Sequence, residues 1–422
     1  MKYDFLFDEL ETSAAHVGFS PPSFLSPSQK AAVLAPPTGA CVVVAGPGSG
    51  KTSVLVERIA YLLGNGAAPD DMLVCTFTRA AADELQTRLA PKLRGKTLSY
   101  CGTMHGLAYR MLGGQQWLLR QGLTLISDDD QLALLHSMML DMGMSDSLSE
   151  KEVLLMLQRA QEGASVPEAY QILAAAWEEQ LEALGYVDFV MLLKWSMKMP
   201  SRRKFRFGLA DEAQDLTPLQ LEWLQRHCRE DAHTYLVGDD DQAVYAFRGS
   251  AQAVLAEEVE RGASCHQLVD NWRCRRNIIE RAYQLIAHNT RRVALPQAPT
   301  REDGDVMVAR FSDEAEELRS LLKMKAAPII LCRTRQEVER FQEAGLEAYT
   351  MHEAKGREWK HVWVSGLEQG ACPHALGDTE EERRLFYVAL TRAKDRLTIS
   401  VRDKVGDRAR KASQFLVEAG LT

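Results

Sequence analysis

The chain has 422 residues, of which 46% are hydrophobic and 26% are charged, and its formal net charge is -8 at pH 7. This length exceeds what one hydrophobic core usually serves, so we expect at least two domains. The composition excludes collagen-like and low-complexity chains, and the negative charge excludes a protein that coats nucleic acid through bulk positive charge.

The sequence contains no apolar run long enough to span a bilayer, and the stretch MKYDFLFDEL at the N-terminus is not typical of a secretory signal. The 8 cysteines are scattered without CxxC pairs, which argues against a zinc site and against a disulfide framework. We therefore expect a cytoplasmic protein with no membrane partner. Short basic clusters at 202–204, 273–276 and 291–292 are each interpreted as solvated faces, so any DNA site has to be a local groove.

The strongest local signal is a glycine loop between a predicted strand and a predicted helix, CVVVAGPGSGKTSVLVERIAYLL at 41–63. Its context is that of a phosphate-binding loop, because glycines let backbone N–H groups turn toward phosphates and the helix N-terminus adds partial positive charge. We expect Lys51 to reach the β- and γ-phosphates and Thr52 to coordinate Mg²⁺. The residues predicted to hold the nucleotide here are Gly46, Gly48, Ser49, Gly50, Lys51 and Thr52.

Helical spacing dominates residues 113–200, in the segments DDDQLALLHSMMLDMGM, EKEVLLMLQRAQEG and EAYQILAAAWEEQLEALG. We interpret this region as a helical insert. The run Asp128 to Asp130 is interpreted as helix capping rather than as a metal site.

An acidic pair follows the next predicted strand, in KFRFGLADEAQD at 204–215. Asp211 can hold Mg²⁺, directly or through water, and Glu212 can orient or deprotonate an attacking water. The alternative is that Asp211 only caps a helix. Together with the phosphate loop, the pair predicts an enzyme that binds and hydrolyses a nucleoside triphosphate.

The segment VGDDDQAVYAFRGS at 237–250 combines two chemistries. Three aspartates and a glutamine suggest a metal or phosphate site, whereas the aromatic and arginine residues that follow suit stacking on nucleic acid bases. The alternative is an acidic turn after a strand, with Tyr245 and Phe247 in the core.

Read in chain order, these segments resemble the motifs of the UvrD/Rep/PcrA-like group of superfamily-1 DNA helicases. The resemblance extends through nearly the whole chain, in family order and near family spacing. It is carried by LSPSQKAAV (25–33), the phosphate loop, TFTRAAADEL (76–85), GTMHGLAYRML (102–112), YVDFVMLL (186–193), LADEAQD, VGDDDQAVYAFRGS, LVDNWRCRRNI (268–278), TMHEAKGREWKHVWVSGLEQG (350–370) and EERRLFYVALTRAKDRLTIS (381–400).

The resemblance implies roles for further residues at the ATP site. Gln29 would read the adenine edge, Trp272 would stack on adenine where most relatives have tyrosine, and Glu358 would contact the ribose. Gln242 would sense the γ-phosphate, while Arg273 and Arg392 would act as arginine fingers that stabilise charge on the transferring phosphoryl group. Arg357 and Trp359 depart from the family pattern Lys-Gly-Leu-Glu-Phe.

The resemblance also implies a single-stranded DNA path that contacts Phe77, Thr78, His105, Tyr245, Phe247 and His352. The family usually has tryptophan at the position of Phe247, so stacking there is expected to be weaker. The loop at 237–250 would then couple the ATP site to the DNA. For His352 the alternative is a core histidine with satisfied hydrogen bonds.

The predicted fold is α/β, with two RecA-like P-loop domains in which helices flank parallel sheets, and a helical insert in the first. We expect residues 1–112 and 201–270 to form the first domain, 113–200 the insert, and 271–422 the second domain. PIILCRTR (328–335) is followed directly by a predicted helix and LEAYTMHEAKG, so the large insertion of the relatives is not expected here. The chain also has no room for the nuclease domain that some relatives append.

Four functions are compatible with these observations. The leading one is an ATP- and Mg²⁺-dependent DNA helicase that moves 3′ to 5′ on single-stranded and forked DNA, in repair, replication or recombination, with an unidentified loading partner. The second is a translocase that displaces proteins from DNA without efficient unwinding. A nuclease or nuclease subunit would need a further carboxylate cluster with a lysine, which the sequence lacks. An ATP-gated binding module without useful hydrolysis is disfavoured by Glu212, Arg273 and Arg392.

Overall fold

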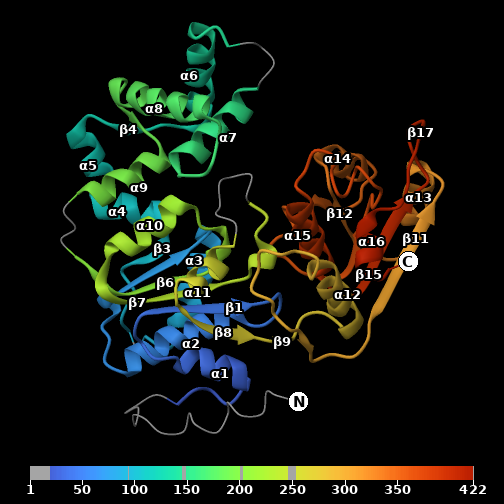
Figure 1. Ribbon diagram of the computed structural model, residues 1–422, viewed down its shortest axis with the longest axis horizontal. Coiled ribbons are helices and arrows are strands. Elements are labelled where there is room, and N and C mark those ends of the chain that lie inside the picture. Colours follow the sequence, from blue (N-terminus) through green and yellow to red (C-terminus); the bar gives the residue numbers. More distant parts are fainter. Residues whose placement is uncertain (1–19, 94, 145–148, 200–202, 246–252, 422) are drawn as a thin grey trace.

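The computed structural model describes residues 20–93, 95–144, 149–199, 203–245 and 253–421 (Figure 1). Its framework is a pair of parallel β-sheets, each between two layers of helices, which confirms the predicted α/β class. Among the described residues, no helix combines the length and the apolar character that a membrane crossing requires.

The first sheet has six parallel strands in the order β3-β2-β6-β7-β1-β8. Its strands are β1 (Ala40–Ala45), β2 (Met72–Thr76), β3 (Cys101–Thr103), β6 (Phe205–Ala210), β7 (Cys228–Gly238) and β8 (Ser264–Leu268). Because side chains alternate along a strand, Val43 packs into the core on one face of the sheet while Val42 and Val44 pack into the core on the other. Burial on both faces explains the continuous apolar run before the glycine loop.

The first face is covered by α1 (Pro27–Leu34), α2 (Lys51–Gly64) and α3 (Arg79–Leu89). The second face is covered by α4 (Met104–Leu112), α10 (Pro218–His227) and α11 (Val254–Glu260), together with part of α9 (Phe189–Lys198). Short 3₁₀ turns η1 (Pro69–Asp71), η2 (Ala213–Asp215) and η3 (Asp240–Gln242) adjoin the strands.

A helical body with its own hydrophobic core stands above this sheet (Figure 1). It is built from α5 (Gly114–Gln121), β4 (Thr124–Leu125), α6 (Asp128–Asp141), α7 (Glu150–Gln161), α8 (Glu168–Ala183), β5 (Tyr186–Val187) and α9. α9 serves both cores, since Leu193 packs toward the sheet and Leu192 packs into the helical body. The cap of α6 is Ser127, whose hydroxyl accepts from the Asp130 amide, and the three aspartates occupy the first helical turn.

The second sheet has five parallel strands in the order β11-β15-β14-β12-β13. They are β11 (Asp305–Phe311), β12 (Ile329–Cys332), β13 (Ala348–Thr350), β14 (Trp359–Val364) and β15 (Ala393–Arg402), followed by the hairpin β16 (Lys404–Val405) and β17 (Arg408–Ala409). One face carries α12 (Arg276–Ile286), α15 (Thr379–Leu390) and α16 (Gln414–Glu418), and the other carries α13 (Glu314–Leu322) and α14 (Arg335–Glu343). Within 253–421, only residues 344–347 separate α14 from β13.

The chain crosses between the two sheets more than once. α12 lies in the core of the second sheet, but Val293 and Leu295 return to the core of the first. The short parallel strands β9 (Asp270–Asn271) and β10 (Ala298–Pro299) pair where the chain crosses. The domain boundaries proposed from the sequence stay predictions.

Candidate nucleotide and DNA site

The glycine loop forms a tight turn between β1 and α2. Gly48 and Gly50 have φ of +70° and +85°, a region that L side chains rarely adopt. A Cβ on Gly48 would collide with the Cβ of Arg273, and a Cβ on Gly50 would collide with the side-chain amide of Gln29. The Ser49 hydroxyl closes the loop by donating to the Gly46 carbonyl at 2.7 Å. The loop therefore has the shape that lets backbone N–H groups surround a phosphate.

The outer side of the loop is held by residues distant in sequence. The Gln29 amide donates to the Ser49 carbonyl at 2.8 Å and accepts from the Ser26 amide at 2.9 Å. The Asn271 side chain donates to the Pro47 carbonyl, and the Trp272 amide donates to the Gly48 carbonyl at 3.0 Å. Gln29 is buried behind the loop, with one donor and one acceptor position of its side-chain amide engaged by the protein, and it does not line the nucleotide cavity.

The two acidic residues lie where β6 ends. The Asp211 carboxylate accepts from the Glu212 amide at 2.9 Å, while the Glu212 carboxylate lies 3.6 Å from the Lys51 ammonium and accepts from Gln214 at 2.6 Å. Glu212 has φ of +50°, a strained conformation for a residue with a side chain. Burial and the neighbouring Glu212 charge raise the pKa of Asp211. Burial alone would raise the pKa of Glu212, but Lys51 and Lys355 outweigh it and lower that pKa, so Glu212 is kept ionised.

A cavity of about 700 Å³ lies between the two sheets. It brings together every residue predicted for catalysis or nucleotide binding except Gln29: Gly46, Gly48, Ser49, Gly50, Lys51, Thr52, Asp211, Glu212, Gln242, Trp272, Arg273, Glu358 and Arg392. Trp272 is 53% exposed and lines the cavity, so its indole is accessible to a ligand there. The glycine loop, the lysine and the strand-end carboxylates fit a nucleoside triphosphate with Mg²⁺.

One predicted arginine finger is neutralised in this structure. Arg273 contacts one oxygen of Glu358 at 2.5 Å, and Lys394 contacts the other at 2.5 Å. Burial alone would raise the pKa of Glu358, but Lys394 and Arg273 outweigh it and lower the pKa. Glu358 engages only the Nε of Arg273, so the ion pair reduces the charge that Arg273 can offer to a phosphate, and release of Glu358 would restore it. Lys394 can keep the carboxylate paired after such a release.

The other predicted finger already crosses between the two sheets. Arg392, 2% exposed, donates to the Gln242 side-chain oxygen at 2.9 Å and to the Arg357 carbonyl at 3.3 Å. Burial lowers the pKa of Arg392 to about 10, which leaves the guanidinium charged at neutral pH. Gln242 donates in turn to Asp239 at 2.7 Å. A side chain of the second sheet thus holds the loop that follows β7.

Each of the three consecutive aspartates has a structural partner. Asp239 accepts from Gln242, Asp240 accepts from the amides of Leu255 and Ala256 at the start of α11, and Asp241 forms a two-pronged ion pair with Arg292 at 2.6 and 2.7 Å. The described residues include no group of three or more His, Cys, Asp or Glu placed to hold a metal ion. These contacts hold the carboxylates in place and shape the loop, and the metal or phosphate site suggested for it stays a prediction.

The structure adds Lys355, which sequence reasoning missed. Its ammonium contacts the Asp215 carboxylate at 2.5 Å, donates to the Gln242 carbonyl at 2.8 Å, and lies 4.8 Å from the centre of the Tyr245 ring. Lys355 also lines the nucleotide cavity. Burial raises the pKa of Asp215 to about 6 despite the neighbouring lysine. The only sequence signal was its place between His352 and Glu358 in the TMHEAKGREW motif.

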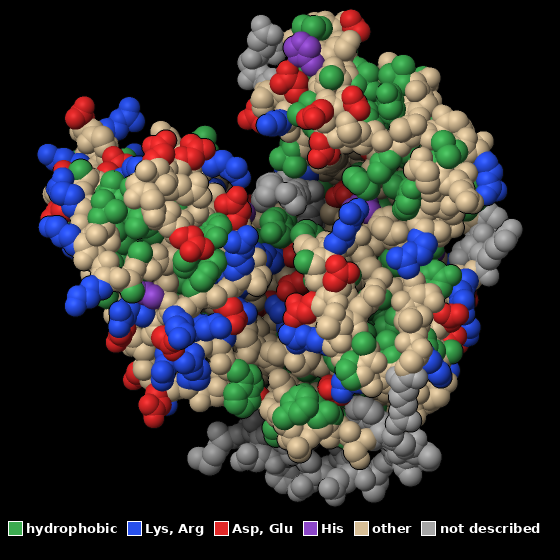
Figure 2. Space-filling view, turned by 180° about the vertical axis from the view of Figure 1, so that it is seen from behind, with side chains coloured by type: hydrophobic (Ala, Val, Ile, Leu, Met, Phe, Trp, Pro, Cys, Tyr) green, Lys and Arg blue, Asp and Glu red, His purple; other side chains and the backbone are tan. Residues whose placement is uncertain are grey.

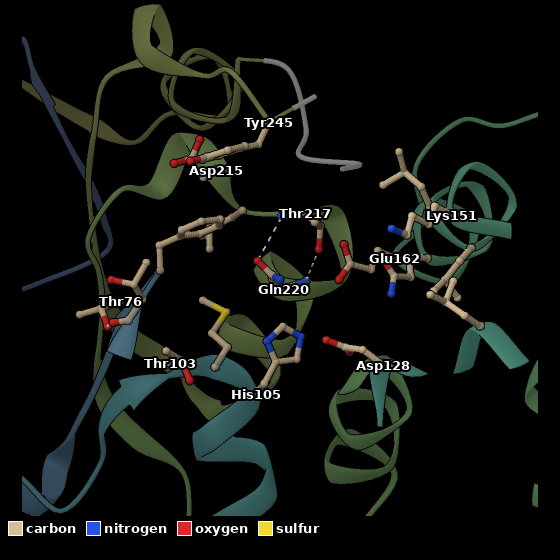
Figure 3. A pocket seen from close by; sticks show the side chains of 18 residues that line it. Thr76, Thr103, His105, Asp128, Lys151, Glu162, Asp215, Thr217, Gln220 and Tyr245 are labelled. Carbon is tan, nitrogen blue, oxygen red and sulfur yellow. Dashed lines mark hydrogen bonds between the residues drawn. The ribbon is translucent and has the colours of Figure 1, made fainter. Parts of the chain in front are cut away.

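A second, larger cavity of about 890 Å³ opens beyond this lysine, between the first sheet and the helical body (Figure 3). Phe77 and Tyr245 stack on one wall, with ring centres 5.4 Å apart and planes 12° from parallel. Figure 3 places Asp215 and Tyr245 on one side and Lys151 and Glu162 of the helical body on the other. We call this cavity the DNA groove.

Thr78 lines both the nucleotide cavity and the DNA groove, and its hydroxyl caps α3 by accepting from the Ala81 amide. His105 lines the groove and packs edge-on against Phe189. Burial lowers the pKa of His105 to about 4, so the ring is neutral, and its buried Nε2 has no hydrogen-bond partner among the described residues.

One predicted DNA contact lies outside the groove, and another falls on a residue that the structure does not describe. His352 is half-buried in the turn after β13, where its carbonyl accepts from the Lys355 amide at 3.2 Å, and it does not line the groove. Phe247 lies outside the described residues. The two departures from the family pattern pack together, since Tyr349 stacks on Trp359 and Arg357 lies over the Tyr349 ring at 4.5 Å.

Comparison with known proteins gives a consistent result. Residues 25–261 match the family model of the UvrD/REP helicase N-terminal domain, and residues 330–404 match that of the UvrD-like helicase C-terminal domain. The chain is 32% identical to DNA helicase II of Escherichia coli (strain K12) over 301 residues, covering 64% of this chain and 41% of that protein. It is 26% identical to DNA helicase IV of the same strain over 478 residues, covering 88% of this chain and 67% of that protein. The chain thus spans less than half the length of DNA helicase II.

Proposed function

Because the chain belongs to the UvrD/REP helicase family, we propose that it is an ATP-dependent DNA helicase that moves 3′ to 5′ along single-stranded DNA and unwinds forked duplexes. The observation that carries the proposal is the short connection between the two cavities. Gln242 lines the nucleotide cavity and Tyr245, three residues later, lines the DNA groove, with Lys355 in contact with both.

Residues of the nucleotide cavity would bind ATP and catalyse its hydrolysis. Lys51 and the amides of the glycine loop would bind the phosphates, while Thr52 and Asp211 would hold Mg²⁺. The ion, when bound, would neutralise charge on the phosphates. Glu212, ionised and held by Gln214, would accept a proton from the attacking water. Arg392, and Arg273 once it leaves Glu358, would stabilise the charge that develops during phosphoryl transfer.

The DNA groove would bind the bases of the single strand by stacking. A base that inserts between Phe77 and Tyr245, or displaces one ring, would exchange protein stacking for base stacking, worth roughly 1–3 kcal/mol per base without regard to sequence. Any shift of Gln242 toward a γ-phosphate would move Tyr245 with it. Lys355 would transmit the same shift to Asp215 and to the second sheet. ATP hydrolysis and base release would therefore be linked through these residues.

A translocase that displaces proteins without efficient unwinding would use the same coupling and is the second candidate. ATP turnover with and without single-stranded DNA tests the motor, and strand separation on substrates with a 3′ or a 5′ tail tests polarity and unwinding. Removal of a bound protein from single strands, without strand separation, would favour the translocase. ATP turnover that single-stranded DNA does not stimulate would contradict both the helicase and the translocase.

The direct link between α14 and β13 supports one further expectation. Relatives carry a large domain at this point whose orientation restrains the monomer, and residues 344–347 cannot build one. We propose that this motor works without that form of self-restraint, with the helical body alone bracing the duplex.

A further inference from the structure

A third cavity, of about 590 Å³, lies at the opposite ends of the strands from the DNA groove. Tyr100 precedes β3, Phe205 begins β6 and His227 precedes β7, so these lining residues mark the amino ends of the first sheet. The other wall comes from the end of α4, from α5 and from α9. We call this cavity the arginine cleft.

The lining of the cleft is positively charged, whereas the protein as a whole is negatively charged. Arg110, Arg120 and Arg203 line it, and no aspartate or glutamate is among its described lining residues, although the whole chain carries a net charge of -8. Arg203 forms an exposed ion pair with Asp70 at 3.3 Å. Arg110 donates to the Ser99 carbonyl, and among the residues that the structure describes neither Arg110 nor Arg120 has a carboxylate within ion-pair distance. Such a lining attracts an anion.

Aromatic rings lie between these cations. Tyr100 packs edge-on against Phe205 with ring centres 4.8 Å apart, and Arg203 lies 5.8 Å from the Tyr100 ring centre. Trp117 packs edge-on against Trp195 at 5.8 Å, and both Tyr100 and Trp117 stay half-exposed in the cleft. Cations interleaved with accessible rings suit a backbone of phosphates with unstacked bases, whereas duplex DNA offers no free base faces.

The lining continues into a neighbouring hollow of about 300 Å³ that shares Ser196, Met199 and His227 with the cleft. This hollow adds three cations and one carboxylate, namely Lys204, Arg226, Arg229 and Glu230. Figure 2 shows Lys and Arg side chains, with Asp and Glu side chains among them, along the edge of the first domain at the right of the view. Arg203 and Lys204 belong to a stretch interpreted from the sequence as a solvated face, and they line the cleft and the hollow respectively.

The cleft is separate from the DNA groove but connected to it by one helix. α4 begins beside His105 in the groove and presents Arg110 to the cleft near its other end. The six residues of β6 span roughly 20 Å between the two edges of the sheet, at about 3.3 Å per residue. A strand held in the groove would not fill the cleft, but a second strand leaving the same junction could reach it.

We propose that the arginine cleft binds the unpaired arm of a DNA fork that the motor does not track. This proposal rests on the proposed function, because it assumes that one strand occupies the DNA groove. Phosphates would contact Arg110, Arg120 and Arg203, and bases would stack on Tyr100 and Trp117. Holding the second arm would keep the separated strands from re-pairing behind the junction.

The test compares the parent protein with the double variant Arg110→Ala/Arg120→Ala, by fluorescence anisotropy without ATP across a salt series. The substrates are a fork with two unpaired arms and the same duplex with either single arm. Each phosphate contact on a single strand contributes about 0.7 to the slope of log K against log salt, so we expect the slope on the fork to fall by roughly 1.4 and binding to weaken roughly tenfold. Binding to the arm that the motor tracks, and DNA-stimulated ATP turnover, should not change.

The matched control is Arg319→Ala/Lys323→Ala, which removes the same charge from exposed positions in and after α13 on the second domain. Fork binding by the Arg110/Arg120 variant that equals the parent's, or an equal loss in the control, would overturn the proposal. Equal losses on the fork and on both single-armed duplexes would also overturn it, since no arm would then be distinguished.

The two proposals can fail separately. If the parent shows no DNA-stimulated turnover yet the fork-specific loss remains, the motor function fails and the cleft stands as a DNA site. Suppose instead that single-stranded DNA stimulates ATP turnover, but the Arg110→Ala/Arg120→Ala variant loses binding of an acidic peptide and not of an unpaired oligonucleotide. The cleft would then serve a protein partner, and the inference would be wrong.

Discussion

The role of Lys355 can be tested by removing its charge with Lys355→Ala. The side chains of Lys355 and Asp215 are 9% and 1% exposed, and their charged atoms lie 2.5 Å apart. Breaking a buried pair by removing one partner costs about 3–5 kcal/mol, because the remaining charge is left unpaired. Burial already raises the pKa of Asp215 to about 6, so without Lys355 the carboxyl can take up a proton near neutral pH. The cost should therefore lie at the lower end of this range of free energies, about 3 kcal/mol.

About 3 kcal/mol corresponds to roughly a hundredfold change in an equilibrium constant. If this contact couples the two sheets, we expect stimulation of ATP turnover by single-stranded DNA to fall by about that factor in Lys355→Ala. Asp215→Asn removes the charge that would be left unpaired, so the double variant Asp215→Asn/Lys355→Ala should recover part of the loss.

The assay is steady-state ATP turnover against the concentration of single-stranded DNA for the parent, the two single variants and the double variant. Lys360→Ala, an exposed lysine on β14, is the control. Parental stimulation in Lys355→Ala would refute the coupling role. Strictly additive losses in the double variant would show that Lys355 acts on the nucleotide alone, without Asp215.

Three further outcomes are expected. Lys51→Ala should abolish ATP hydrolysis while leaving binding to single-stranded DNA intact, and normal hydrolysis by this variant would contradict the phosphate-loop assignment. Tyr245→Ala or Phe247→Ala should reduce unwinding and translocation more than ATP turnover at saturating DNA; if both unwound at the parental rate, the rings would have only a core role. In single-turnover unwinding a lone molecule should be active, so activity that requires several molecules on each tail would contradict an unrestrained monomer.

Features whose chemistry is local could be predicted from the sequence. The glycine loop needs only residues 46–52 and their flanking strand and helix, so Lys51 and Thr52 are placed by spacing alone. The acidic pair follows its strand directly, and burial on both faces makes the strands visible as apolar runs. The parallel α/β class follows from the alternation of these elements.

Contacts between distant segments could not be predicted this way. The Asp241 ion pair depends on Arg292, fifty-one residues later, and the coupling role of Lys355 depends on how the second sheet approaches the first. Gln29 is buried against the Ser49 carbonyl for the same reason. A local acidic pattern such as Asp239 to Asp241 suggests a metal site, but spacing does not reveal which carboxylates already have structural partners.

Because the chain crosses repeatedly between the two sheets, a single proteolytic cut would not separate the two domains cleanly. α12 precedes the return of Val293 and Leu295 to the first core, yet it buries Ile278, Ile279 and Leu285 in the second. A protease that cuts the chain between 300 and 304 would leave α12 joined to the amino-terminal fragment and still embedded in the other half. The two fragments would therefore stay associated after cleavage, and a fragment beginning at 305 would lack a helix of its own core.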